Sequence, residues 1–235
     1  MQIALAFFLI LIPIIFNWTF ASLSNQFDYS DILRQPTNLV LAKFRAGGSR
    51  LVMTWWLFAL SAVGFGFLAV LLPIQFSFDP AMTALVATLG LLASLTQFLG
   101  LVRWPFVVPH LAREAENASK EKLDALDVVF QSLNRYLGVA VGEHLGYLFT
   151  GLWSFALGAG LLLQDQVSHS GWYVAFGISG LILGGLLVLC SLEFVGRNEQ
   201  NGWKLASTIT PFVYIAWSLW LVAMGISMLL GTIAG

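Results

Sequence analysis

Charged residues are scarce in this chain. Only 10% of its 235 residues are Asp, Glu, Lys or Arg, whereas 58% are hydrophobic. Soluble domains carry about 25% charged residues, so an ordinary water-facing surface is excluded. The net charge of −1 supplies no basic field for nucleic acid. We therefore expect a surface that faces membrane lipid, and no nucleic-acid partner.

Cysteine and catalytic motifs are also lacking. Cys190 is the only cysteine, which excludes a disulfide framework or a CxxC metal motif within one chain. The sequence contains no Walker loop, dinucleotide fingerprint or GxSxG elbow. No lysine lies inside an apolar run, which excludes a retinal Schiff base. These absences favour a protein that is not an enzyme, and no residue is assigned a catalytic role.

Six long apolar runs dominate what is present. A helix of about 20 mostly apolar residues crosses a bilayer, and only helices satisfy the backbone of such runs in lipid. The sequence therefore predicts an all-α integral membrane bundle with short amphipathic helices on the inner side. We expect one transmembrane domain over residues 1–235, with spans at about 3–23, 50–72, 82–103, 136–163, 172–195 and 204–231.

The basic residues follow a topological pattern. All eleven Lys and Arg residues fall in three alternate loops, after the first, third and fifth runs. The two other loops hold Asp79, Asp165 and His169. Basic loops stay in the cytoplasm, so we expect a multi-pass bacterial inner-membrane protein with both termini outside. Met1 and Gln2 give no positive n-region, so the first run is predicted to be a retained span.

The inner loops predict short helices. Thr37 is an expected N-cap and Gly47 an expected stop for a helix that lies on the membrane interface. Pro105 and Pro109 are expected to end or kink the third helix after Arg103. A second amphipathic helix, continuous with the fourth span, is predicted from three- and four-residue spacing of Leu123, Leu126, Phe130, Leu133 and Leu137.

Glycine recurs every fourth residue in the fourth and fifth runs. Small residues at this spacing let helix backbones approach closely. We expect helix packing at Gly138, Gly142 and Gly146 and at Gly180 and Gly184. Because both helices carry the pattern, we expect these two helices to meet.

Glu143 and His144 are ionisable residues inside a predicted span. They follow Arg135 by eight and nine residues, or roughly 12–13 Å along an α-helix. A group at that depth is a functional hypothesis by default, although a structural pair bonded to a neighbouring helix explains it equally well. Spacings of seven and four place Tyr136 and Tyr147 on the face of Glu143.

Other polar residues are expected at a similar depth. The ligand-binding candidates are Glu143, His144, Gln97, Arg103, Tyr147, Glu193 and His110. Adjacent helical residues point about 100° apart, so a metal at Glu143 and His144 would also need His110 and Glu193. Haem would have a single histidine ligand, because His110 lies near the interface. A quinone would take hydrogen bonds from His144, Tyr147 or Arg103. Haem and metal therefore both stay open as cofactors.

Four segments carry a family resemblance: Phe27-Asp-Tyr-Ser-Asp-Ile-Leu-Arg-Gln-Pro36, Phe44-Arg-Ala-Gly-Gly48, Thr54-Trp-Trp56 and Asn134-Arg-Tyr-Leu-Gly-Val-Ala-Val-Gly-Glu-His-Leu-Gly-Tyr147. Over residues 27–155 the chain resembles small bacterial polytopic membrane proteins that are catalogued only as a domain of unknown function. The resemblance implies a multi-span bacterial membrane protein and supplies no catalytic residue.

Three functions follow from these observations. The first is an accessory or structural subunit that binds lipid and protein partners in a membrane assembly. The second is a membrane protein that binds haem, metal or a lipophilic ligand such as a quinone. The third is a pathway for protons or a small solute through the polar layer.

Overall fold

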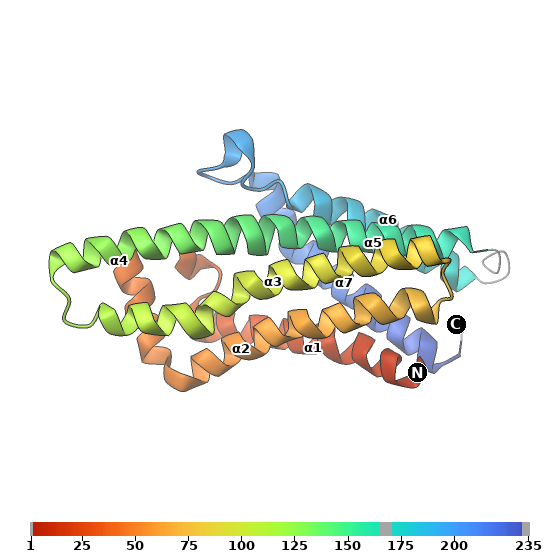
Figure 1. The fold of residues 1–235 in the computed structure, drawn as a ribbon, viewed down its shortest axis with the longest axis horizontal. Helices are drawn as coiled ribbons and strands as arrows, with labels where there is room; N and C mark the ends of the chain where they lie inside the picture. The colour runs from red at the N-terminus through yellow and green to blue at the C-terminus, as the bar shows by residue number, and fades with distance from the viewer. Residues whose placement is uncertain (1, 165–170, 232–235) are drawn as a thin grey trace.

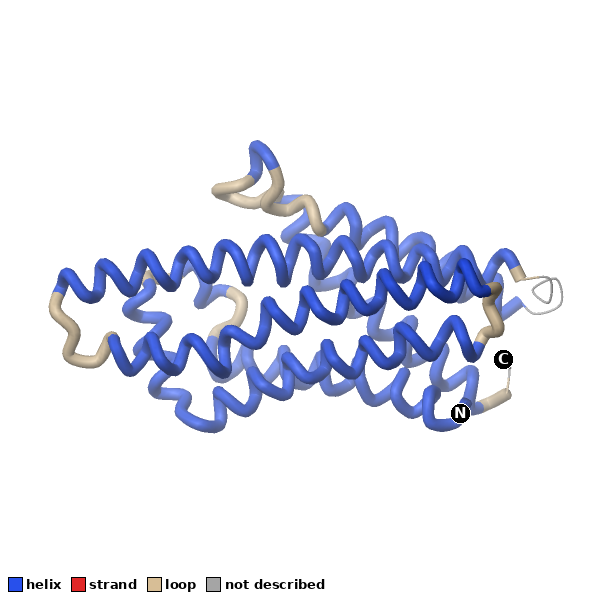
Figure 2. The backbone as a smooth tube through the Cα atoms, viewed as in Figure 1, coloured by secondary structure: helices blue, strands red, loops and turns tan. Residues whose placement is uncertain are grey.

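The computed structural model describes residues 2–164 and 171–231. Helices make up nearly all of this part of the chain, and no strand occurs in it (Figure 2). The longer elements are α1 (Gln2–Phe27), α2 (Thr37–Gln75), α3 (Pro80–Glu114), α4 (Lys120–Leu133), η2 (Asn134–Leu145), α5 (Gly146–Leu163), α6 (Gly171–Cys190) and α7 (Lys204–Leu229). Short 3₁₀ turns occur at η1 (Asp31–Arg34) and η4 (Gly196–Asn198).

Six helices in the described ranges are long and apolar enough to cross a membrane, with α4, η2 and α5 forming one of them. This confirms the predicted all-α class and the six spans, and the chain is a polytopic membrane protein in contact with lipid. Several boundaries differ: α2 already begins at Thr37, α3 continues to Glu114, and the fourth crossing helix begins at Lys120, all well outside the predicted spans. The first helix runs on to Phe27, and the fifth ends at Cys190 rather than at residue 195. Asp165 and His169, expected in one loop, lie outside the described residues.

The helices run side by side in an elongated bundle (Figure 1). Neighbouring pairs include α1 with α2 and α7, α2 with α3, α3 with α5, and α6 with α5 and α7. The α2–α3 turn lies at the end of the bundle where α1 starts and α7 stops (Figure 1). The connections that follow α1, α3 and α6 lie toward the other end (Figure 1). The basic residues lie in these connections, as Arg34 and Arg197 do, or in the helix segments that adjoin them. We call this other end the basic end.

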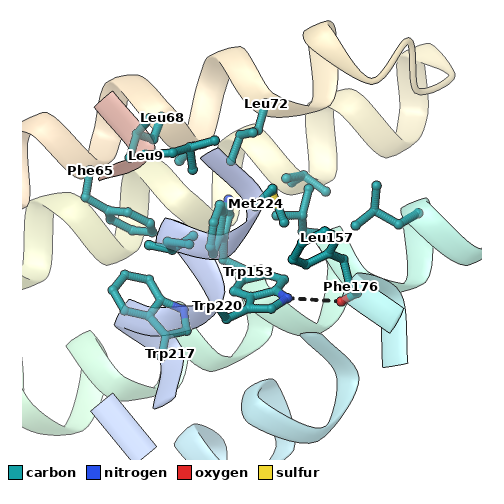
Figure 3. Packing of buried hydrophobic residues seen from close by; sticks show 14 of the residues in the cluster. Leu9, Phe65, Leu68, Leu72, Trp153, Leu157, Phe176, Trp217, Trp220 and Met224 are labelled. Carbon is teal, nitrogen blue, oxygen red and sulfur yellow. Dashed lines mark hydrogen bonds between the residues drawn. The ribbon is translucent and has the colours of Figure 1, made fainter. Parts of the chain in front are cut away.

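One hydrophobic core centres on three tryptophans, Trp153, Trp217 and Trp220 (Figure 3). The indole Nε1 of Trp217 donates to Ser154 Oγ at 2.9 Å, and that of Trp220 donates to the carbonyl oxygen of Phe176 at 3.1 Å. Buried indole N–H groups usually find such partners. These bonds tie α7 to α5 and α6 in the apolar middle of the bundle.

A second core lies at the basic end. Trp55 of α2 and Trp104 of α3 stack with ring centroids 4.5 Å apart and an angle of 11°. Leu126 and Phe130 of α4 are buried in the same cluster. The apolar stripe predicted for this amphipathic helix therefore packs on the bundle.

The short helix after the first loop differs from the prediction. It is part of α2, and its N-cap is Pro36 rather than Thr37. The Thr37 hydroxyl instead donates to Asp127 and accepts from Gln131 Nε2, which joins α2 to α4. The break comes at Gly48, where φ is 55° and ψ is −154°, one residue after the expected stop at Gly47.

The apolar side of this short helix packs on protein. Val40, Leu41 and Phe44 are buried in the second core, whereas Leu39 is exposed. The expected interfacial helix is therefore held mainly by the bundle, and only part of its apolar surface remains for lipid.

Helix α3 also departs from its predicted end. It continues through Pro105 and Pro109 to Glu114. Trp104, Pro105 and Val108 are buried, so tertiary packing holds the helix together where proline removes a backbone donor. Prolines are tolerated in membrane helices when neighbouring elements support them in this way.

The segment η2 is a π-helix of 12 residues, which the sequence pattern did not indicate. Its i→i+5 bonds give about 4.4 residues per turn, so seven residues make about 1.6 turns rather than two. Tyr136 consequently lies away from Glu143 and is 66% exposed. Since Glu143 is partly buried, the expectation that these two residues share a face is wrong.

Candidate functional site

Glu143 lies on η2 within the fourth membrane-crossing helix and is partly buried. In the described part of the chain its carboxyl group makes neither an ion pair nor a hydrogen bond. Its charge interacts with those of Arg103, Glu193 and Arg34. These charged groups come from η2, α3, η1 and the segment after α6. Together with Tyr29, we call Glu143, Arg103, Arg34 and Glu193 the Glu143 cluster.

Arg103 is the buried cation of this cluster and is 8% exposed. Its guanidinium donates to the carbonyl oxygen of Gly100 and, at 2.9 Å, to Oδ1 of Asn134. It also lies 5.2 Å from the ring centroid of Trp104, a cation–π distance. Neutral acceptors hold the side chain, and in the described residues no carboxylate forms an ion pair with it. Its positive charge therefore remains uncancelled beside Glu143.

Glycines create the space for this arrangement. A Cβ atom added to Gly100 would lie 2.5 Å from Cα of Gly142, so α3 and η2 touch backbone to backbone. A Cβ atom on Gly138 would lie 2.6 Å from an Arg103 nitrogen, and one on Gly146 would lie 3.0 Å from Gln97. The glycine series of the fourth run thus packs on α3 and accommodates Arg103.

The second glycine series has different partners. Gly180 packs on Gly158, and Gly184 packs on Gly151, both on α5. The fourth and fifth spans do meet, but through Gly151 and Gly158. The two helices therefore meet as expected, while Gly138, Gly142 and Gly146 pack on α3.

His144 and Gln97 are fixed in helix contacts. Nδ1 of His144 lies 2.7 Å from the carbonyl oxygen of Ser191, which follows α6. Because a carbonyl oxygen only accepts, Nδ1 carries the hydrogen in this contact. Gln97 Nε2 donates to the hydroxyl of Thr150 at 2.7 Å, and that hydroxyl donates to the carbonyl oxygen of Gly146 at 2.7 Å. Both side chains therefore connect helices.

The remaining candidates divide into two groups. Tyr147 packs edge-on against Tyr214 at 5.1 Å and interacts electrostatically with Glu143. Glu193 follows α6, and its burial raises the pKa of its carboxyl, with the Arg34 charge opposing the rise. His110 is exposed, seven residues or about 10 Å beyond Arg103 on α3. The structure brings Tyr147 and Glu193 to Glu143 and leaves His110 apart.

Tyr29 and Arg34 also belong to the cluster, although the sequence pattern did not indicate them. They lie in the loop between α1 and α2, and the ring of Tyr29 packs edge-on against Trp55 at 4.9 Å. Burial first, and the Glu143 charge second, raise the pKa of Tyr29 to about 12. Both residues stand in the Phe27–Pro36 segment of the resemblance, which was the one available signal.

Two hollows lie near these residues. A cleft of about 420 Å³ is lined by Ser24, Asp28, Tyr29, Asp31, Ile32 and Gln35. A much smaller hollow of about 10 Å³ lies between α3 and α4, where Arg103 and Asn134 line it. Within residues 2–164 and 171–231 no three His, Cys, Asp or Glu side chains are grouped closely enough to hold a metal ion. The cleft thus reaches the Glu143 cluster through Tyr29.

Comparison with known proteins identifies a family. No curated protein and no solved structure matches the chain. A family model described as a domain of unknown function (DUF4386) matches residues 5–225. The match extends the resemblance found at residues 27–155 into the last three spans. It covers nearly the whole chain, and the protein therefore belongs to the DUF4386 family of domains of unknown function.

Proposed function

We propose that this membrane protein takes up and releases a proton at Glu143, as part of a proton pathway that starts at the basic end of the bundle. One observation carries the proposal. Glu143 forms no hydrogen bond or ion pair in the described structure, whereas His144, Gln97 and Arg103 are all bonded. A carboxyl group without fixed partners exchanges a proton without breaking a structural bond.

The surrounding charges suit such an exchange. An isolated carboxylate is costly in a low-dielectric interior. Arg103 is held by neutral acceptors, so its positive charge stabilises Glu143 when the proton has left. The charge of Arg34 also favours the ionised form of Glu143, whereas the negative charge of Glu193 disfavours it.

Proton flux into liposomes tests this function. The purified protein is reconstituted with an internal pH-sensitive dye, and a potassium potential drives proton entry. Because Gln cannot exchange the proton, we expect Glu143→Gln to lower the protein-dependent flux about a hundredfold. The control is Glu121→Gln, the same substitution at an exposed residue of α4. Equal flux in wild type and Glu143→Gln would rule the proposal out.

The proposal includes an orientation. A single transmembrane domain in the bacterial inner membrane, with both termini outside, places all eleven basic residues on the cytoplasmic side. Cysteines at Ala118 and Ser77, introduced in a Cys190→Ser background, test it with an impermeant thiol reagent. Ser77→Cys should react in intact cells, and Ala118→Cys only after permeabilisation. The reverse pattern would invert the topology.

An accessory or structural subunit is the second candidate. It is favoured because most polar residues near Glu143 serve helix contacts, as His144 and Gln97 do. Purification in mild detergent separates the two candidates: a partner at fixed stoichiometry together with absent flux supports the subunit. An absorption spectrum and a metal analysis of the same preparation test the cofactor alternative, since a haem band lost in His144→Ala would establish it.

A further inference from the structure

The connection between α6 and α7 lies at the level of the membrane surface. Helix α6 has 20 residues, which extend about 30 Å at about 1.5 Å per residue and match the hydrocarbon thickness of a bilayer. Residues 191–203 follow it directly and lead to α7 at Lys204. They stand out sideways from the bundle, whereas the α3–α4 turn lies farther along its length, at the tip (Figure 1). We call residues 191–205 the surface loop.

The surface loop is closed by its own contacts. The backbone N–H of Trp203 donates to the carbonyl oxygen of Glu193 at 2.7 Å. The backbone N–H of Gly202 donates to the carbonyl oxygen of Asn198 at 2.8 Å. The ring of Phe194 lies against Gly202, whose added Cβ atom would be 3.1 Å from it. The loop is therefore ordered before it meets a partner, which lowers the entropic cost of binding.

The uncompensated charges of the surface loop are positive. Arg197 and Lys204 are exposed, and in the described part of the chain neither side chain forms an ion pair. Glu199 pairs with Arg135 of η2, which offsets its charge. The carboxyl group of Glu193 is partly buried rather than displayed on the loop. The loop thus presents two exposed cations to a negatively charged partner.

Apolar side chains accompany these cations. Leu192, Val195 and Leu205 are exposed, and Trp203 is partly exposed. Tryptophan is enriched at the level of lipid headgroups, because its ring is apolar and its N–H group is polar. Exposed apolar residues beside lysine and arginine at a membrane boundary fit a lipid with an anionic headgroup.

We propose that the surface loop binds an anionic phospholipid. Arg197 and Lys204 bind its headgroup phosphate, and the three exposed apolar side chains of the loop lie among the acyl chains. The guanidinium group of arginine binds two phosphate oxygens at once, and lysine adds a point charge. This inference concerns the choice of lipid and does not depend on the proposed proton exchange.

The lipid affinity of the full chain is the first test. The protein is purified in a neutral detergent, and native mass spectrometry measures its binding of phosphatidylglycerol and of phosphatidylcholine. Each basic residue near an anionic lipid surface contributes about fivefold to binding. Arg197→Gln/Lys204→Gln should therefore weaken the binding of phosphatidylglycerol about 25-fold and leave that of phosphatidylcholine unchanged.

Arg113→Gln/Lys120→Gln is the matched control. It removes two exposed charges beside the α3–α4 turn, far from the level at which α6 ends (Figure 1), so it should keep the wild-type affinity. Equal affinity for phosphatidylglycerol in Arg197→Gln/Lys204→Gln and in wild type would overturn the proposal. An equal loss in both double variants would also overturn it, because general charge attraction would then hold the lipid.

The depth of the loop gives a second test that does not depend on affinity. A spin label at Val195→Cys, in the Cys190→Ser background, is compared in liposomes with one at Ala118→Cys in the α3–α4 turn. The label at Val195→Cys should collide more often with oxygen, which concentrates in lipid, than with a water-soluble nickel chelate. The label at Ala118→Cys should show the reverse preference. Equal access of the nickel chelate to both labels would overturn the proposal.

Discussion

The imidazole of His144 joins η2 to the segment after α6, with Nδ1 2.7 Å from the carbonyl oxygen of Ser191. Removing the donor leaves a partly buried acceptor without its partner, so His144→Ala should lower the free energy of unfolding by about 1–3 kcal/mol. His144→Asn should recover part of this loss, because its amide nitrogen donates from a similar position. Unfolding in mixed micelles measures both, with exposed His110→Ala as the control. Equal stability of His144→Ala and wild type would show that the contact contributes nothing.

The backbone contact between Gly100 and Gly142 predicts intolerance of a single methyl group. A Cβ atom on Gly100 would lie 2.5 Å from Gly142 Cα, so the two helices must separate. We expect Gly100→Ala to cost about 1–3 kcal/mol, the usual range for overpacking. Gly185→Ala is the matched control, because nothing lies within 4 Å of its added Cβ. A Gly100→Ala protein that unfolds like Gly185→Ala would contradict the contact.

Gly48 should resist substitution for a different reason. Its added Cβ would meet nothing within 4 Å, but its φ of 55° with ψ of −154° suits glycine alone. Gly48→Ala should therefore cost about 1–3 kcal/mol of backbone strain, measured by thermal unfolding in detergent. The neighbouring exposed Ser49→Ala should be neutral. A neutral Gly48→Ala would mean that the break in α2 is not needed.

Glu193 predicts a pH dependence of stability. Burial raises the pKa of its carboxyl in the folded state above the ordinary value of 4.5. The raised pKa means that the folded protein favours the neutral form. The resulting stabilisation is complete below pH 4.5 and is lost as the pH rises through the folded-state pKa.

The measurement compares wild type with Glu193→Gln, which cannot ionise. The stability of the variant relative to wild type should increase as the pH is raised from about 4.5 toward neutrality. Exposed Glu121→Gln should show no such rise. A constant difference between the Glu193 variant and wild type across this range would contradict the prediction.

Hydropathy was sufficient to predict the six spans because lipid imposes length and composition on each helix. Details that depend on neighbours were not predictable. Proline chemistry favoured an end of α3 near Arg103, but burial of Trp104 and Val108 holds the helix together for eleven more residues. Local sequence carries no record of such tertiary support.

The candidate site shows the same division. Glu143, Arg103 and Glu193 were selected because charge inside an apolar run is conspicuous in sequence. Tyr29 was missed because it follows α1 in a polar loop, and only the folding of that loop onto Trp55 brings it within electrostatic range of Glu143. The packing role of the glycines was predictable from their spacing, but the partner of Gly138, Gly142 and Gly146 on α3 was not, because it depends on tertiary packing.

The π-helical winding of η2 has a consequence for insertions and deletions. Each of its 12 residues advances by about 82° instead of about 100°. The segment therefore falls more than half a turn behind an α-helix of equal length. If two residues were lost there and the remaining ten wound as an α-helix, the total rotation would be about 1,000° instead of about 980°, and α5 would keep nearly the same angular position. The same loss inside α5 would turn its glycines away from α6, so length variation should concentrate at residues 134–145.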